Sequence, residues 1–279
     1  MNIAIKRFEN IQKLIDCNAE YFYSNYFIFY QMTGIIDKIL SGGEFQSSKI
    51  FTLEDNLGNR LVFLQTNLTY LIFGKYLELE DVLDVIKSEI NLSELKELQF
   101  IGCKDIILNL FKGNNKNYEL IKDRIIYECQ SVQQIKPTSG NIQLAEIGNH
   151  EEISKMSFEY QKEEYGKNSF RDYSYMSGIV LNGIKSHNIL TWVDNNKICS
   201  ILQLTTLGGY GYIGHLFTKH AERGKGYASN LIYHATQKVL NNNYDKVGLV
   251  SDSLNLTTNS IFRKVGYINI YETITLVNR

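Results

Sequence analysis

Proline is almost absent from this chain, and its one occurrence lies near the middle of the sequence. Among 279 residues there is a single proline, Pro137, in the segment Ser131–Gly140, where polar residues and glycine also gather. Such a composition is typical of exposed connections between domains. We therefore predict a linker at 131–140, with one domain at 1–130 and another at 141–279.

The chain also lacks the segments that mark membrane proteins, secreted proteins and metal sites. It has no run of about 20 apolar residues that could span a bilayer, and no apolar signal-peptide segment at its N-terminus. The aromatic run Tyr21–Tyr30 is too short to span a membrane and predicts a core helix, with an aromatic ligand wall as the alternative. The cysteines are too far apart for metal-ligand or redox-pair spacing: Cys17, Cys103, Cys129 and Cys199. We expect a cytoplasmic protein with buried, reduced thiols, no membrane partner and no metal.

The chain also has no large excess of positive or negative charge. Hydrophobic residues make up 44% and charged residues 21%, which indicates a globular protein, and the net charge is −1. With no basic cluster, this balance speaks against nucleic-acid binding. Residues 1–130 hold 14 Lys and Arg against 18 Asp and Glu, while residues 131–279 hold 15 against 12. The mildly basic second half suits a phosphorylated ligand, but the G-x-x-x-x-G-K-[ST] motif of nucleoside-triphosphate sites is absent.

Hydrophobic periodicity predicts a similar order of helices and strands in the two halves of the chain. The second half gives a strand at 141–147, helices at 150–165 and 170–185, strands at 188–193, 197–207 and 211–218, a helix to 241, a strand at 246–251, a helix at 257–265 and a closing strand at 268–277. The first half gives helices at 8–18 and 20–41, strands at 50–54, 60–66 and 70–73, a helix at 80–90, a strand at 98–102, a helix at 104–112 and a strand at 118–128. We expect an α+β protein of two tandem domains, each a mixed sheet flanked by helices.

The most informative stretch is Arg223–Ala228, with the sequence RGKGYA, between a predicted strand and a predicted helix. Backbone N–H groups point out of a first helical turn, glycine lets a ligand approach the backbone, and the helix dipole favours negative charge. These residues predict an anion site. The corresponding stretch of the first half, Gly74–Asp81, carries acidic residues that would repel a phosphate.

Two motifs together resemble the GNAT superfamily of acyl-CoA-dependent N-acetyltransferases. The family signature Q/R-x-x-G-x-G/A is present as RGKGYA at 223–228, after the strand end Leu216–Thr218. A second motif, N-x-x-(S/T)-x-x-(I/L)-Y-x-K-x-G-(F/Y), is present over Asn255–Tyr267 with Phe262 at its first aromatic position. The resemblance covers 141–279. For 1–130 only the element order suggests a degenerate copy of the domain, without the cofactor motif.

The resemblance implies a cosubstrate, acetyl-CoA, and residues that bind it. Backbone N–H groups from Gly224 to Ala228 would bind the pyrophosphate, with Arg223 and Lys225 adding charge. The pantetheine arm would lie along the end of the strand, and Asn255 would hydrogen-bond it. The implied cofactor-binding residues are Leu216, Phe217, Thr218, Arg223, Gly224, Lys225, Gly226, Tyr227, Ala228 and Asn255.

Acetyl transfer to an amine needs the amine neutral, and a lysine-like amine has a pKa of about 10.4. His215 is the candidate general base because its ordinary pKa lies near 6.5, with a packed strand histidine as the alternative. Strand alternation would place Ile213, His215 and Phe217 on one face. By analogy with the family, a backbone N–H near Phe217 would bind the oxyanion. Phe262 stands where many family members have a tyrosine acid, so a non-catalytic coenzyme A-binding protein is the alternative function.

In members of this family, the first two helices of the domain line the site of the acceptor. Here residues 158–175 are rich in carboxylates and tyrosines. A solvated helix face would explain the charges. The sharper hypothesis is a small, cationic amine held by Glu163, Glu164 or Asp172 beside tyrosine rings.

Overall fold

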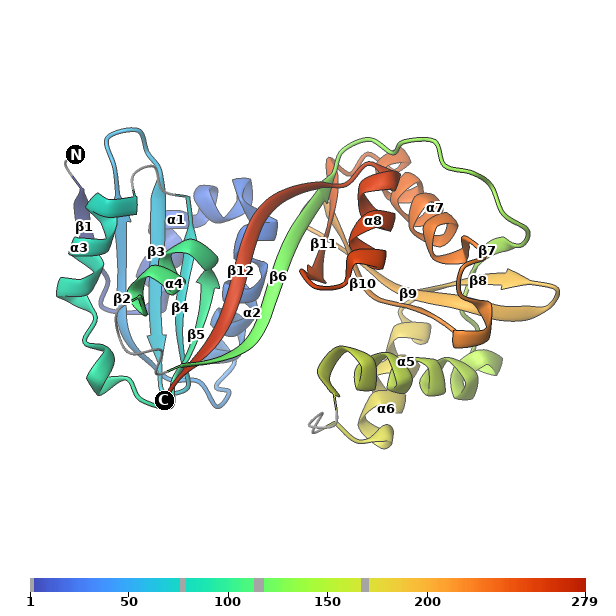
Figure 1. Cartoon of the computed structure of the whole chain (residues 1–279), viewed down its shortest axis with the longest axis horizontal. Helices are drawn as coiled ribbons and strands as arrows, with labels where there is room; N and C mark the ends of the chain where they lie inside the picture. The colour runs from blue at the N-terminus through green and yellow to red at the C-terminus, as the bar shows by residue number, and fades with distance from the viewer. Residues whose placement is uncertain (1–2, 76–78, 113–117, 167–170) are drawn as a thin grey trace. The chain divides into compact units, whose positions relative to one another are not determined.

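The computed structural model describes residues 3–75, 79–112, 118–166 and 171–279, without the side chains of 79–81. The chain forms two compact units (Figure 1). Unit 1 contains Met1–Ile126, Asp252–Leu254 and Asn269–Arg279, and unit 2 contains Tyr127–Ser251 and Asn255–Ile268.

Unit 1 is a mixed sheet between two pairs of helices. Its elements are β1 (Ala4–Arg7), α1 (Ile11–Ser24), α2 (Tyr26–Leu40), β2 (Ser47–Glu54), β3 (Arg60–Thr66), β4 (Thr69–Gly74), α3 (Leu79–Glu89), η1 (Leu92–Glu94), β5 (Gln99–Cys103), α4 (Lys104–Leu110), most of β6 (Tyr118–Cys129) and nearly all of β12 (Ile268–Asn278). Alternate residues of β3 pack on opposite faces: Phe63 joins the core beneath α3 and α4, whereas Val62 and Leu64 join the core beneath α1 and α2. The sheet is therefore buried on both faces.

Unit 2 contains the second set of elements. They are β7 (Asn141–Leu144), η2 (Ile147–Asn149), α5 (His150–Tyr165), α6 (Tyr173–Lys185), β8 (Ile189–Asp194), β9 (Lys197–Leu207), β10 (Tyr210–Thr218), η4 (His220–Glu222), α7 (Tyr227–Asn241), β11 (Lys246–Asp252) and α8 (Leu256–Val265). The turn between β8 and β9 has positive φ at Asn195 (48°) and Asn196 (60°), as a tight hairpin requires. The predicted hairpin is confirmed.

The two units share one topology. In unit 1, β1, β2, β3 and β4 pair antiparallel in that order, and β4 pairs parallel with β5. In unit 2, β7, β8, β9 and β10 pair antiparallel in that order, and β10 pairs parallel with β11. Two helices follow the first strand of each unit, and one helix connects each parallel pair. The predicted α+β fold, a mixed sheet flanked by helices, is confirmed.

The last strand, β12, belongs almost entirely to unit 1, although it follows the elements of unit 2 in the sequence. β12 pairs antiparallel with β5 of unit 1 from Thr273–Cys103 to Val277–Gln99. Ile274 and Leu276 are buried in the core of unit 1. A boundary at 131–140 puts this strand with the second half of the chain, whereas the structure puts residues 269–279 in unit 1.

Two smaller predictions need correction, and one strand was not predicted. The aromatic run Tyr21–Tyr30 is not one core helix, because α1 ends and α2 begins around Asn25 and Tyr23 is 52% exposed. Cys17 is exposed, although the other three cysteines are buried as expected. β1 was not predicted, because its four residues are mostly exposed and lack an alternating pattern.

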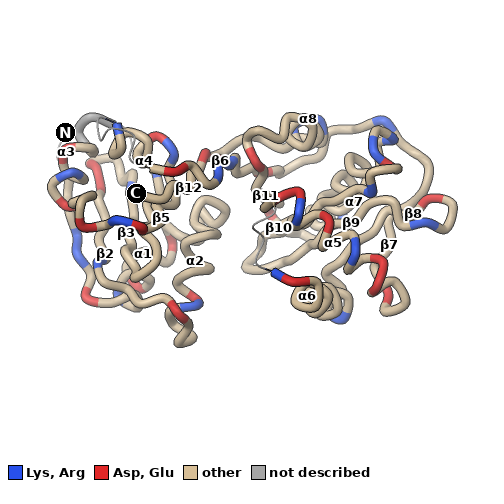
Figure 2. The backbone as a smooth tube through the Cα atoms, turned by 60° about the horizontal axis from the view of Figure 1, so that its bottom comes forward, with Lys and Arg blue, Asp and Glu red and all other residues tan. Residues whose placement is uncertain are grey.

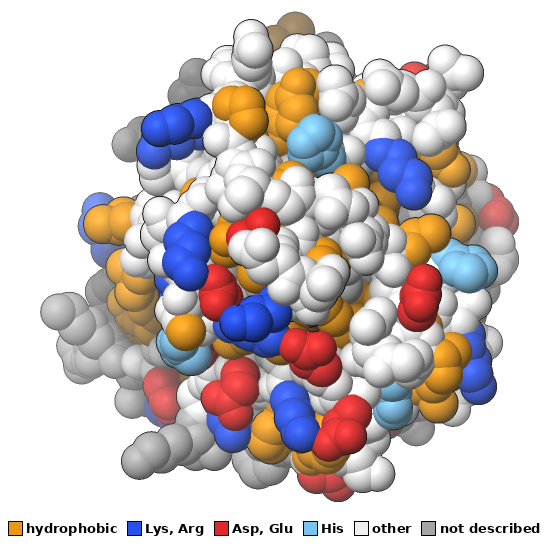
Figure 3. Space-filling view, turned by 90° about the vertical axis from the view of Figure 1, so that its right-hand side faces the viewer, with side chains coloured by type: hydrophobic (Ala, Val, Ile, Leu, Met, Phe, Trp, Pro, Cys, Tyr) orange, Lys and Arg blue, Asp and Glu red, His pale blue; other side chains and the backbone are white. Residues whose placement is uncertain are grey.

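Charges of both signs are distributed along the backbone of each unit (Figure 2). On the face of the molecule in Figure 3, Lys and Arg side chains lie among Asp and Glu side chains. Across the described ranges, no helix is long and apolar enough to cross a membrane. Nor do the described His, Cys, Asp and Glu residues form a group of three that could hold a metal ion.

Candidate functional site

A bulge in β10 creates the opening of the site. β10 pairs with β9 as far as Gly214–Gln203, and the register then shifts before Phe217–Ile201. His215, within the bulge, has a φ of 52°. Parallel pairing of β10 with β11 ends at Ile213–Leu249, so the two strands separate where the bulge begins. The predicted alternation of Ile213, His215 and Phe217 is wrong beyond Gly214, because the bulge adds one residue to β10.

A cavity of about 630 Å³ lies beyond this point, within the size range of ligand pockets. Its walls come from α5, the end of β10, the turn before α7, the start of α7, and α8. The lining residues are Tyr160, Glu163, Glu164, Leu216, Phe217, Thr218, Glu222, Arg223, Gly224, Gly226, Tyr227, Ala228, Ser229, Asn255, Thr257, Thr258, Ile261 and Lys264. Every residue predicted to bind the cofactor lines this cavity except Lys225. Their role in binding stays a prediction.

The turn before α7 depends on two glycines. Gly224 and Gly226 have φ values of 80° and 85°, a backbone region that other residues rarely adopt. Gly226 is the N-cap residue of α7, and no side chain caps this helix end. The first backbone bond of α7 runs from the Asn230 N–H to the Gly226 carbonyl at 3.1 Å. The N–H groups of Tyr227, Ala228 and Ser229 therefore precede the helical ladder, at the wall of the cavity.

Both cations of the turn are already paired. Nη2 of Arg223 lies 2.8 Å and 2.9 Å from the two carboxylate oxygens of Glu163, and its Nε donates to the Thr218 carbonyl at 3.0 Å. Lys225 donates to Glu222 at 2.7 Å, and this hydrogen bond raises the pKa of Lys225. Neighbouring carboxylates thus offset much of the positive charge that the sequence suggested for an anion.

His215 lies beside the cavity rather than in its wall. Its ring packs against the Tyr160 ring at a centroid distance of 5.0 Å, and Tyr160 lines the cavity. His215 also borders a void of only about 10 Å³, together with residues of α5, α6, β8 and β9. Burial, and then the charge of Arg171, lower the pKa of His215 below its ordinary value. Burial therefore favours the neutral imidazole.

The second motif has structural roles besides its predicted one. Asn255 caps α8 by accepting a hydrogen bond from the Thr258 N–H at 3.1 Å, and it also lines the cavity. Phe262 is 4% exposed and packs against the rings of Tyr127 and Tyr267 at centroid distances of 5.7 Å and 6.0 Å. Phe262 is thus a core residue of unit 2.

The three carboxylates proposed for the acceptor are not equivalent. Glu163 is bound by Arg223 and also lies 2.9 Å from Nε2 of His220. Asp172 caps α6 by accepting from the Tyr175 N–H at 2.7 Å. Glu164 lines the cavity near Tyr160. The sequence had suggested neither the Glu163–Arg223 pair nor the position of Tyr160, because both depend on how α5 packs on β10.

The predicted linker 131–140 is part of unit 2. The Thr138 hydroxyl donates to the Lys225 carbonyl at 2.9 Å, directly behind the glycine turn. Asn230 in the first turns of α7 donates to the Lys136 carbonyl at 3.2 Å. The sequence alone had indicated no role for Thr138 or Asn230. The only signal was the lone proline between Lys136 and Thr138, which fits a fixed segment as well as a linker.

Comparisons with known proteins identify a family for part of the chain and related folds for the whole of it. The profile of the Acetyltransferase (GNAT) family matches residues 150–267. Among solved structures, a GNAT-family acetyltransferase from Colwellia psychrerythraea is 12% identical with a TM-score of 0.59, and the match covers 99% of this chain and 100% of that chain. A GCN5-related N-acetyltransferase from Sphaerobacter thermophilus is 13% identical with a TM-score of 0.52, covering 81% of this chain and 79% of that one. A Drosophila protein is 8% identical with a TM-score of 0.56, covering 100% and 99%. At these identities the structures support the fold alone. No curated protein matches the sequence.

Proposed function

We propose that residues 150–267, which form a domain of the GNAT acetyltransferase family, use acetyl-CoA to acetylate an amine in the 630 Å³ cavity. The proposal is supported mainly by the structure of the chain at the start of α7. Two left-handed glycines lead into a helix N-terminus without a side-chain cap, and this end lines a cavity of ligand size. That combination suits the pyrophosphate of coenzyme A.

The cosubstrate would be held mostly by backbone groups. The N–H groups from Gly226 to Ser229, at the glycine turn and the first turn of α7, are the proposed donors to the pyrophosphate. Leu216–Thr218, where β10 no longer pairs with β11, would accept the pantetheine arm as if it were an added strand. Asn255 would contribute its side-chain NH2 group, since its carbonyl oxygen already caps α8.

The chemical step requires the transfer of one proton as well as the binding of the cosubstrate. Acetyl transfer breaks the thioester bond, forms an amide, and moves one proton from the amine to solvent or to the thiolate. A thiol with a pKa of about 8.5 leaves readily near neutral pH, so the absence of a hydroxyl at Phe262 does not prevent transfer. We retain His215 as the proposed base because burial favours its neutral form and it contacts Tyr160 in the cavity wall.

A cationic small amine is the proposed acceptor. Of the three candidate carboxylates, Glu163 and Glu164 line the cavity, whereas Asp172 caps α6. The nearby ring of Tyr160 would pack against an alkylammonium group. The proposal therefore narrows to the α5 residues of the cavity wall, Glu163 and Glu164 with Tyr160.

The test has two stages. Isothermal titration with coenzyme A and with ATP measures binding, and incubation with acetyl-CoA plus polyamines, aminoglycosides or amino acids measures thiol release and product mass. We expect coenzyme A but not ATP to bind, and at least one amine to gain an acetyl group. Binding without turnover on any amine would favour a non-catalytic coenzyme A-binding protein, because Phe262 replaces the usual acid. Absence of coenzyme A binding would refute the proposal.

A further inference from the structure

The segment Ser131–Gly140, which we call the strap, is fixed to unit 2 along its whole length. Near its start, the Gln133 N–H donates to the carbonyl of Val265 at the end of α8, at 2.8 Å. Near its end, the indole N–H of Trp192 donates to the Ser139 carbonyl at 2.9 Å. Gly140 has a φ of 92°, and a Cβ there would lie 2.4 Å from the Val193 carbonyl oxygen. The strap is thus anchored on α8 and β8.

Between these anchors the strap contacts the turn that begins α7. The Thr138 hydroxyl donates to the Lys225 carbonyl at 2.9 Å. The side-chain NH2 of Asn230, a residue only 3% exposed, donates to two carbonyls, that of Gly226 at 3.0 Å and that of Lys136 at 3.2 Å. The carbonyls of Lys225 and Gly226 are therefore each held by one side-chain donor.

Holding these carbonyls also orients the N–H groups on the other side of the same peptide bonds. A peptide unit is planar and trans, so its carbonyl and the N–H of the next residue point in opposite directions. The bond from Thr138 thus sets the direction of the Gly226 N–H, and the bond from Asn230 sets that of the Tyr227 N–H. Gly226 has no Cβ to restrict it, so without these bonds its two peptide planes would rotate more freely.

We propose that Thr138 and Asn230 are positioning residues that aim the N–H groups of Gly226 and Tyr227 at the pyrophosphate of the cosubstrate. The strap acts through the turn and touches no substrate itself, since neither residue lines the cavity. This inference rests on the proposed function, because it assigns a role in binding coenzyme A. It predicts a defect confined to ligands that carry the pyrophosphate.

The experiment compares Thr138→Val with Thr138→Ser in the full chain. Valine keeps the branched shape but removes the donor, and serine restores the donor without the methyl group. Loss of one such hydrogen bond should weaken coenzyme A binding about three- to tenfold by calorimetry. Thr138→Ser should bind within about twofold of the wild type. Thr206→Val, on the exposed end of β9 and outside the cavity, is the matched control.

A second readout separates positioning from general loss of structure. S-acetylpantetheine carries the reacting thioester but no pyrophosphate. We expect Thr138→Val to raise the KM for acetyl-CoA by the same factor as the Kd, and to leave kcat/KM for S-acetylpantetheine unchanged. Equal loss with both donors, or unchanged coenzyme A binding, would overturn the inference while leaving the proposed function intact. Failure of the wild-type chain to bind coenzyme A would instead refute the proposed function.

Discussion

The two units have the same topology, but the ends of β4 and β10 differ. In unit 2 the bulge separates β10 from β11, and the backbone from Leu216 to Thr218 lines a cavity. In unit 1, β4 likewise leaves its parallel neighbour β5 after Ile72–Gly102, but it pairs with β3 without a register shift. The end of β10 is thus open to a cavity, whereas side chains close the end of β4.

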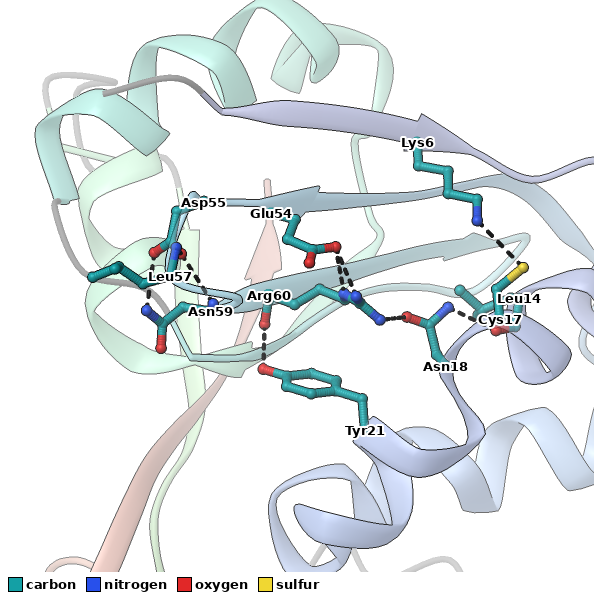
Figure 4. Close-up of polar contacts among 10 residues, drawn as sticks. All are labelled: Lys6, Leu14, Cys17, Asn18, Tyr21, Glu54, Asp55, Leu57, Asn59 and Arg60. Atoms are coloured by element: carbon teal, nitrogen blue, oxygen red, sulfur yellow. Dashed lines mark hydrogen bonds and ion pairs between the residues drawn. The ribbon is translucent and has the colours of Figure 1, made fainter.

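Two tyrosines occupy the backbone groups at the closed end. The Tyr271 hydroxyl donates to the Gly74 carbonyl at 3.0 Å and accepts from its N–H at 3.2 Å. The Tyr21 hydroxyl donates to the Arg60 carbonyl at 2.6 Å, as Figure 4 shows, and accepts from the Lys75 N–H at 3.2 Å. The same figure shows Arg60 held by Glu54 and Asn18. A strand end whose backbone groups are bonded by the protein's own side chains has none left for a ligand.

Removing the Tyr271 hydroxyl should have the largest effect on this comparison. Tyr271→Phe leaves the N–H and the carbonyl of Gly74 without their partner, which should destabilise unit 1 by about 1–3 kcal/mol. Urea unfolding followed by hydrogen exchange measures this loss. Tyr118→Phe is the control, because its hydroxyl has no hydrogen-bond partner in the described part of unit 1. Coenzyme A binding should not change. Equal stability of the two variants would show that the end of β4 does not depend on Tyr271.

Alkaline pH should affect the same contact. Burial raises the pKa of Tyr271 well above its ordinary value. The neutral phenol is thus favoured in the folded chain, and its contribution to stability is complete below pH about 10, where the unfolded tyrosine is also neutral. Above that pH the contribution is lost as the unfolded tyrosine ionises. The difference in stability between the wild type and Tyr271→Phe should therefore shrink above pH 10.

The next largest effect is expected in unit 2, at the glycine turn before α7. At Gly226 a Cβ would meet nothing closer than Asn230 Nδ2 at 3.8 Å, so only the φ of 85° opposes a side chain. Gly226→Ala should cost about 1–2 kcal/mol of the turn geometry, which corresponds to a roughly five- to thirtyfold weaker coenzyme A affinity. Gly34→Ala, in α2 of unit 1 with open space around it, should instead stabilise the protein by about 0.5–1 kcal/mol. Unchanged binding by Gly226→Ala would contradict the role of the turn.

Histidines distinguish the units at mildly acidic pH. All five lie between residues 150 and 234, so unit 1 contains none. The pKa of His215 is lowered, so its contribution to stability is present above pH about 6.5 and is lost as the pH falls below that value. Between pH 7.5 and 5.5, hydrogen exchange should show unit 2 losing up to about 1 kcal/mol more than unit 1.

His215→Gln should remove this difference between the units. If His215 is also the base, the variant should lose the acid limb of kcat/KM below pH 6.5. A limb that persists in the variant would refute that role.

The smallest effect concerns the charge of Arg223. Glu163→Gln removes the carboxylate that neutralises this arginine at the cavity wall. Because both side chains are more than 40% exposed, we expect the ion pair between Arg223 and Glu163 to contribute only about 0.2–1 kcal/mol. Coenzyme A should bind up to about fivefold more tightly at low salt, with the gain lost at high salt. The control is Glu152→Gln, which breaks the ion pair of α5 with Lys219 instead. Weaker binding by Glu163→Gln alone would mean that the position of Arg223 matters more than its charge.

The sequence was sufficient for the local features of the site and insufficient for the long-range ones. The two motifs correctly located the glycine turn, the start of α7 and the start of α8, because capping and glycine requirements are local. The bulge at His215 could not be predicted, since nothing in the sequence GYIGHLFT marks where β10 leaves β11. The strap was predicted as a linker because proline, glycine and polar residues predict exposure, not what the exposed segment contacts. The acidic run Gly74–Asp81 of the first half lies partly outside the described residues.

The position of β12 has a consequence for how the protein is made. Unit 1 needs residues 269–279 to cover β5, and the bond from Tyr271 to Gly74 joins residues 197 positions apart. At an elongation rate of about 5–20 residues per second, the chain from 126 to 269 takes on the order of ten seconds to synthesise. During that time the nascent first unit keeps an unpaired edge at β5 and an incomplete core. Although its sequence emerges first from the ribosome, unit 1 is the last to complete its fold.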